Sequence, residues 1–263
     1  MAEDDFPERG FLAGFGVLTE QFGVGAFAHF SRTPSPVQKT RTSFRGIEQP
    51  NVESGVGIGG LVIGRADHAL HPMLTETRIG RTTLRLVTGD IAEQDTEAVV
   101  TAAHWRLNKG TGTDGTIHSK GGPAIYEECR RIGGCPIGEA VITTGGKLKA
   151  RHVIHAVGPV WRGGDEEEPE LLASAYRRSL EVAAEHGLRS VSFPSISTGA
   201  FVFPIRLAAP IAVRTVIGFL REGRHTFDEV RFVLYVREDA RALEIFAAAL
   251  AVEVGEFPEA SSQ

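Results

Sequence analysis

Short apolar runs rich in β-branched residues alternate with longer amphipathic segments from about Thr77 to Val252. This alternation is typical of an α/β layered domain, in which helices cover a mostly parallel sheet. Most of the runs are nearly continuous in apolar residues, which indicates strands that are buried on both faces. The expected strands are residues 84–87, 98–100, 140–142, 152–154, 191–193 and 230–234.

Four helices are predicted in the segments between and after these strands, because apolar residues recur there at spacings of three and four. They cover residues 123–131, 170–186, 204–220 and 241–252. Pro123 and Pro204 suit first-turn positions, where a missing N–H costs no hydrogen bond. Gly187 suits the position just after a helix, where the backbone turns left-handed.

The two ends of the chain lack this pattern. Residues 1–76 are rich in glycine and proline and carry no sustained period, so we expect a poorly ordered extension. The apolar stretch 10–30 is interrupted by polar residues, which argues against a membrane span, and the acidic start argues against an export signal. Residues 253–263 read as a frayed acidic tail.

Charge and cysteine usage exclude several classes of protein. The chain has 33 acidic and 28 basic residues, a net charge of −5, which argues against a protein built chiefly to bind nucleic-acid phosphates. Cys129 and Cys135 are six residues apart, without a CxxC pair or a neighbouring pair of histidines. Neither a disulfide framework nor a zinc site is indicated, so we expect no metal, no cofactor and a reducing, cytoplasmic location.

Three loops at predicted strand ends are richer in chemistry than a scaffold requires. Asp90 follows Gly89 after the first strand, where it could cap a helix or accept hydrogen bonds from a ligand. The loop 109–118 contains glycines that let backbone N–H groups approach an anion, with a helix behind it. The loop 194–201 is a second small-residue turn, so the pair favours a pyrophosphate over a single phosphate.

These loops, in this order, are where the chain resembles the macro domain family. The resemblance covers about residues 77–252 and rests on motifs in family order: Gly89-Asp90-Ile91, Thr113-Asp114-Gly115-Thr116-Ile117-His118, Glu127-Glu128-Cys129-Arg130, Gly138 to Thr143, Val153 to Trp161 and Phe193 to Gly199. It implies a three-layer α/β/α sandwich around a mixed, mostly parallel six-stranded sheet. It also implies an ADP-ribose cleft at the strand ends, with no cofactor and no obligatory partner.

The resemblance assigns roles residue by residue. Asp90 would take the adenine amino group, beside the backbone N–H of Ile91. Backbone donors of the loop 110–115 and of the loop 197–201 would hold the diphosphate, Phe201 would face the distal ribose, and Asp114 would be the acid used by hydrolytic members. The implied substrate-binding residues are Asp90, Ile91, Thr101, Gly110, Gly112, Gly115, Thr116, Ser197, Thr198, Gly199, Ala200 and Phe201.

The chain departs from the family pattern at the reacting end. His104 stands where the family usually has an asparagine that contacts the distal ribose, within Thr101-Ala102-Ala103-His104. Lys109, Thr111 and Val202 replace glycines, and each adds a Cβ where backbone should approach ligand. A histidine can gain charge near neutral pH. A positive charge there would oppose cleavage, so we expect slow hydrolysis that falls further as pH drops toward 6.

Each candidate also has a structural interpretation. Asp114 could serve an Asx turn rather than catalysis, and His104 could be a hydrogen-bonded filler rather than an acid or base. His118, His155, Trp161 and both cysteines are expected to be structural, and the acidic run 165–168 to be a solvated loop.

Two functions follow. One is an enzyme that removes ADP-ribose, or a group attached to it, from a protein, nucleic acid or small molecule, with Asp114 and His104 as catalytic candidates. The other is a non-catalytic module that binds ADP-ribose or a related nucleotide.

Overall fold

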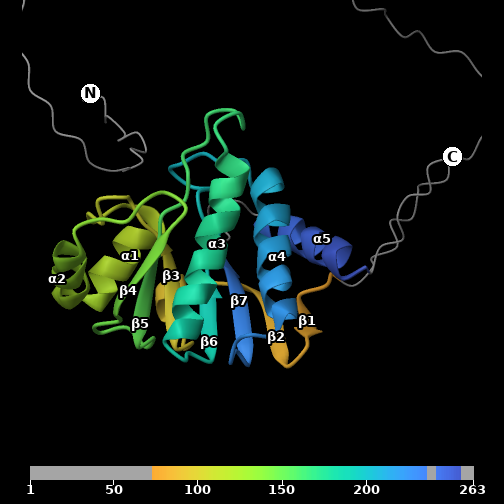
Figure 1. Ribbon diagram of the computed structural model, residues 1–263, viewed down its shortest axis with the longest axis horizontal. Helices are drawn as coiled ribbons and strands as arrows, with labels where there is room; N and C mark the ends of the chain where they lie inside the picture. Colours follow the sequence, from red (N-terminus) through yellow and green to blue (C-terminus); the bar gives the residue numbers. More distant parts are fainter. Residues whose placement is uncertain (1–72, 236–240, 256–263) are drawn as a thin grey trace, which may run out of the picture. The chain divides into compact units, whose positions relative to one another are not determined.

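A computed structural model describes residues 73–235 and 241–255 of the chain. These residues form a seven-stranded sheet with helices on both faces (Figure 1). The expected three-layer α/β class is therefore correct, with one strand more than the six predicted. The elements are β1 (Glu76–Ile79), β2 (Thr82–Thr88), the 3-10 helix η1 (Ile91–Glu93), β3 (Ala98–Ala102), α1 (Gly112–Gly121), α2 (Pro123–Ile132), β4 (Ala140–Thr144), β5 (His152–Ala156), α3 (Glu168–Glu185), β6 (Ser190–Phe193), α4 (Ile205–Glu222), β7 (Glu229–Leu234) and α5 (Ala242–Val254).

The strand order places several loops on one edge of the sheet. The order is β1-β2-β7-β6-β3-β5-β4, and only the two outermost strands, β1 and β4, run antiparallel to their neighbours. The five central strands are parallel, so the loops that follow them leave from the same edge. Open α/β sheets bind ligands at this edge.

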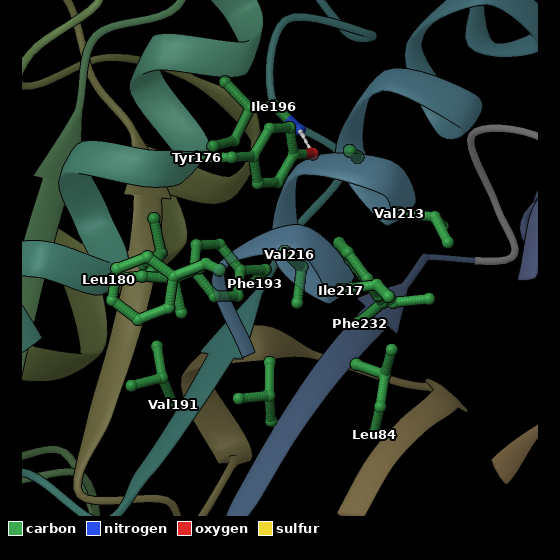
Figure 2. Close-up of a cluster of buried hydrophobic side chains, with 14 of the residues drawn as sticks. Leu84, Tyr176, Leu180, Val191, Phe193, Ile196, Val213, Val216, Ile217 and Phe232 are labelled. Carbon is green, nitrogen blue, oxygen red and sulfur yellow. Dashed lines mark hydrogen bonds between the residues drawn. The ribbon is translucent and has the colours of Figure 1, made fainter. Parts of the chain in front are cut away.

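Two hydrophobic cores lie on opposite faces of the sheet. Side chains of successive strand residues alternate between faces: in β3, Ala98 and Val100 join the core under α3, α4 and α5, while Val99 joins the core under η1, α1 and α2. Figure 2 shows the larger core, which includes Phe193 and Phe232. Both faces being covered explains why the strands are continuous apolar runs.

One strand and one α-helix were not predicted from the sequence, and neither was the short 3-10 helix η1. The edge strand β1 buries only Ile79, and its pairing with β2 is supported by an ion pair between Glu76 and Arg85 at 2.7 Å. Helix α1 begins at Gly112, inside the segment predicted as a loop. Its glycine-rich sequence has almost no helical periodicity, and burial of Ile117 and His118 in the core stabilises it instead.

Helix ends follow the predicted signals closely. Pro123 is the first residue of α2, and Gly187 has a φ of +65° just after α3. Pro204 lies at the N-cap position, one residue before α4. Helix α5 continues through Glu253 and Val254, which were predicted as part of the tail. Of the extension predicted at residues 1–76, residues 1–72 lie outside the described residues, and Glu76 belongs to β1. The tail from residue 256 onward also lies outside them. None of the helices in the described ranges is long and apolar enough to cross a bilayer.

Candidate functional site

A cavity of about 680 Å³ opens at the edge where the parallel strands end. This volume is in the range of ligand pockets. Its walls come from the loops after β2, β3 and β6 and from the end of β7. Predicted site residues that line it are Asp90, Ile91, His104, Gly110, Gly112, Asp114, Thr116, Ser197, Gly199, Ala200 and Phe201.

Three predicted binding residues lie behind the cavity wall. Thr101 is fully buried, and its hydroxyl donates a hydrogen bond to Asp114 Oδ1 at 3.2 Å. A Cβ on Gly115 would come 2.8 Å from the Gly110 carbonyl oxygen, so this glycine permits close backbone packing. The Thr198 hydroxyl donates to Ser195 Oγ at 2.7 Å and braces the loop. These residues support the site from behind.

Asp90 lines the cavity from the loop after β2. Its Oδ1 accepts a hydrogen bond from the Ala92 N–H at 2.8 Å, so the predicted capping role is present, at η1. Its Oδ2 lies 2.8 Å from Lys120 Nζ. Partial burial pushes the pKa of Asp90 upward, but the hydrogen bonds from Lys120 and Ala92 outweigh it and hold the pKa below its ordinary value. The carboxylate is therefore ionised at neutral pH while it faces the cavity.

Asp114 lies deeper, at 3% exposure, on the first turn of α1. Its Oδ2 accepts a hydrogen bond from the Gly110 N–H at 2.7 Å and lies 3.7 Å from Nε2 of His118, one helical turn further along. Burial raises the pKa of Asp114, and its hydrogen bonds and the neighbouring His118 only partly oppose this. The result is a carboxylate of raised basicity held rigidly at the cavity wall.

His104 lines the cavity from the segment after β3. Its Nδ1 lies 3.2 Å from the backbone nitrogen of Arg106. Because a backbone N–H can only donate, Nδ1 is the acceptor and the ring hydrogen sits on Nε2. In this tautomer the free edge of the imidazole offers a donor and no acceptor, unlike the amide of asparagine.

The loop 194–201 is held in place by the larger core. The buried Tyr176 hydroxyl accepts a hydrogen bond from the Ile196 N–H at 2.9 Å (Figure 2). It also donates one to the Pro194 carbonyl at 3.2 Å. Ser197 follows with a φ of +66°, and its buried Oγ has no hydrogen-bond partner among the described residues. Packing of a helix thus fixes a strained turn against the cavity.

Some cavity residues were not predicted from the sequence because they do not belong to a turn of small residues. Val233 and Tyr235 line the cavity at the end of β7, and Tyr235 is 45% exposed. Asn108, in the segment between His104 and the glycines, lines it as well. The available signal was the topology, because β7 is a central parallel strand whose end must reach the same edge.

The structure also gathers His118, Cys129 and His155 in the smaller core. Their potential metal-ligand atoms lie within 4.8 Å of one another, which the sequence spacing did not indicate. Burial, however, raises the pKa of the Cys129 thiol to about 11 and lowers the pKa of His155 to about 3. Both side chains are therefore uncharged at neutral pH, as expected for groups packed in a core. The Thr143 hydroxyl, 2.9 Å from His155 Nε2, already occupies that nitrogen, so we assign the cluster to packing.

Fold and cavity together define a three-layer α/β domain with a ligand cleft at the carboxyl edge of its sheet. Comparison with known proteins identifies the family: the sequence model described as Macro domain matches residues 100–212. A macro domain-containing protein of Caldanaerobacter subterraneus is 52% identical over 160 residues, 59% of this chain and 90% of that protein. One of Streptomyces coelicolor is 50% identical over 175 residues, 64% of this chain and 99% of that protein.

Solved structures agree. An Oceanobacillus iheyensis macrodomain with ADP has a TM-score of 0.65 at 37% identity, covering 70% of this chain and 97% of that one. A Trypanosoma brucei macrodomain in complex with ADP-ribose has a TM-score of 0.58 at 33% identity, covering 64% of this chain and 68% of that one. The chain belongs to the macro domain family.

Proposed function

We propose that this protein binds ADP-ribose, free or attached to another molecule, in the cavity at the sheet edge. The observation that carries the proposal is the set of chemical groups that line one cavity. An ionised carboxylate, two loops of small residues, a second carboxylate of raised basicity and a histidine all line it. The relatives whose structures hold ADP or ADP-ribose support this assignment.

The proposed ligand fits these groups by chemistry. Asp90 can accept hydrogen bonds from the amino group of adenine, and the aromatic ring of Tyr235 lines the same cavity. The diphosphate needs donors without bulk, which the loops at Gly110–Gly112 and Ser197–Ala200 offer. Helix α1 begins at Gly112, so its N-terminal dipole adds a favourable interaction with negative charge.

We also propose that the protein hydrolyses an ADP-ribose linkage, slowly. Water would attack the anomeric carbon of the distal ribose, and the bond from that carbon to the attached group would break. Asp114 would accept the proton from water and stabilise positive charge that develops on the ribose. The burial that raises the pKa of Asp114 makes it the stronger proton acceptor of the two carboxylates.

The second candidate function is binding without turnover, which the histidine at position 104 favours. Its free edge is a donor only, so it reproduces half of the hydrogen bonding of the usual asparagine. In either case the ADP-ribose can be attached to a protein, a nucleic acid or a small molecule. Buried free thiols at Cys129 and Cys135 fit the reducing, cytoplasmic location that we propose.

Calorimetric titration with ADP-ribose tests the binding proposal. Asp90→Ala should weaken binding by about 1–3 kcal/mol, the cost of losing a hydrogen bond to a charged group. Asp165→Ala, which removes an exposed carboxylate from the loop before α3, is the matched control. Unchanged affinity in Asp90→Ala, with an intact fold by circular dichroism, would refute the role of Asp90. No binding by the wild type would refute the proposed function.

Single-turnover release of ADP-ribose from a mono-ADP-ribosylated protein separates the two functions. If the protein is an enzyme, Asp114→Asn should abolish release while ADP-ribose affinity changes less than in Asp90→Ala. Wild-type protein that binds ADP-ribose and shows no release above the uncatalysed rate would establish the binding module instead.

A further inference from the structure

Lys120 links the recognition end of the cavity to helix α1. Its Nζ lies 2.8 Å from Asp90 Oδ2 and 2.6 Å from Glu93 Oε1. Lys120 is on the last turn of α1, whereas Asp90 is the N-cap of η1 and Glu93 is its last residue. Asp90 lines the cavity, whereas Lys120 does not, so the lysine holds the carboxylate from behind.

Two different elements thereby fix the two oxygens of Asp90. The Ala92 N–H of η1 holds Oδ1 at 2.8 Å, and the ammonium of α1 holds Oδ2 at the same distance. A carboxylate has about four lone-pair sites, so each oxygen keeps one for a ligand. With both contacts in place, rotation about χ2 is blocked before any ligand arrives. Preorganisation of this kind lowers the entropy cost of binding.

We infer that Lys120 is a positioning residue for base recognition: it orients the Asp90 carboxylate toward a 6-amino purine and so sets the selectivity of the cavity for adenine. The inference rests on the proposed function and adds a residue that the cavity lining alone does not reveal. Lys120 acts through Asp90 and makes no contact with the base. Removing it should therefore weaken the binding of a ligand that carries the amino group and leave the binding of a ligand that lacks it nearly unchanged.

The chain provides a matched control for this effect. Lys149 Nζ lies 3.3 Å from Glu93 Oε2, so Lys149 neutralises the same neighbouring acid without reaching Asp90. Lys149 is 61% exposed in its side chain and is not among the cavity residues. Lys120→Met and Lys149→Met remove the same charge, from the same cluster, and differ in the contact with Asp90.

The experiment compares two ligands by calorimetry with the full chain: ADP-ribose, and its analogue in which purine replaces adenine, so that only the 6-amino group is missing. The ratio of their affinities measures recognition of that group. We expect Lys120→Met to lower the ratio about threefold to tenfold, the effect of a contact worth about one hydrogen bond. Lys149→Met should leave the ratio unchanged, and Lys120→Arg should restore much of it.

The background of Asp90→Ala completes the test. Because Lys120 acts through Asp90, Lys120→Met should have no further effect on the ratio once the carboxylate is gone. An unchanged ratio in Lys120→Met, or a raised one, would overturn the inference, since a raised ratio would mean that the lysine competes with the amino group. Wild-type protein that binds neither ligand would instead refute the proposed function.

Discussion

At the scale of single residues, strain gathers around the cavity. Four non-glycine residues in the described ranges have φ between +50° and +66°. Leu107, Ser197 and Val202 lie in or next to the two loop segments that line the cavity, and Glu167 lies before α3. A β-branched residue rarely adopts this left-handed conformation. Val202 is also 62% exposed, so packing does not compensate for its strain. Strain of this kind persists where the surrounding structure imposes it, commonly at functional sites.

Replacing Val202 by glycine should therefore stabilise the protein. The left-handed conformation costs an L-residue roughly 1–2 kcal/mol, and glycine avoids this cost. Glycine also raises the entropy of the unfolded chain, which offsets about 0.5–1 kcal/mol of the gain in stability. We expect a net gain of about 0.5–1 kcal/mol, a rise in Tm of roughly 1–4 °C for a domain of this size. Thermal unfolding of Val202→Gly and Val252→Gly tests this gain. Val252 is exposed on a helix, so its replacement by glycine should lower the stability of the protein. A lower Tm for Val202→Gly would contradict the strain.

The histidine at position 104 gives a second prediction at this scale. Asparagine has both a donor and an acceptor, whereas the free edge of His104 has a donor alone because Arg106 N–H occupies Nδ1. His104→Asn should raise the single-turnover rate about 2- to 10-fold, the effect of one hydrogen bond of about 0.5–1.5 kcal/mol. ADP-ribose affinity should change less. Fast wild-type turnover that His104→Asn abolishes would show that the histidine is itself catalytic.

At the scale of elements, the acidic segment before α3 has a role that its sequence did not indicate. Residues 165–168 were predicted to be a solvated loop, yet Glu168 is only 2% exposed. Its carboxylate accepts hydrogen bonds from the backbone N–H groups of Arg162, Gly164 and Glu166, at 3.0, 3.1 and 2.6 Å. Burial opposes ionisation of Glu168, but these donors lower its pKa to about 2. One side chain thus organises the loop that enters the helix.

This geometry predicts a pH-dependent contribution to stability. A folded-state pKa of about 2 lies below the ordinary value for glutamate, so the contribution is present near neutral pH and is lost as pH falls from about 4.5 toward 2. Glu168→Gln should have a lower Tm than wild type at pH 7, with the gap narrowing as pH falls from about 5 toward 2. Glu170→Gln, at an exposed position on the same helix, should show no such convergence. A gap that is constant with pH would exclude ionisation as the cause.

How far the sequence predicts this fold depends on how each element is stabilised. Six of the seven strands were predicted, because strands that are buried on both faces have nearly continuous apolar sequences. Helix α1 was missed because Gly112, Gly115 and Gly121 have poor helix propensity, and tertiary packing of Ile117 decides the outcome. Strand β1 was missed because an edge strand needs little burial. Both failures concern structure that only neighbours stabilise.

The site divides in the same way. Loops with glycine and a following carboxylate were recognisable, and they do meet at one cavity. Contacts across the fold could not be predicted from the sequence. Examples are the ion pair of Lys120 with Asp90, the hydrogen bond from Thr101 to Asp114, and the presence of Tyr235 in the same cavity as the glycine loop. Each depends on the position of one element against another, which residue spacing along the chain does not contain.

At the scale of the whole molecule, both cores are built from residues between Leu74 and Val254 in the described part of the chain. We therefore predict that a chain beginning at Met73 folds by itself, with a Tm close to that of the full chain. Expression of residues 73–263, with thermal unfolding and ADP-ribose titration beside the full chain, tests it. An aggregated product, or a much lower Tm, would show that residues 1–72 contribute to folding.

The pairing of β2 with β7 determines when the sheet can form during protein synthesis. The hydroxyl of Thr82, at the start of β2, donates a hydrogen bond to the carbonyl oxygen of Phe227, which is 145 residues later in the chain. At roughly 5–20 residues per second, a ribosome needs about 7–30 s to deliver that partner. Until then β1 and β2 form at most a two-stranded hairpin, which is marginal in water. The nascent chain must therefore keep β1 and β2 from pairing with other chains until β7 has been synthesised.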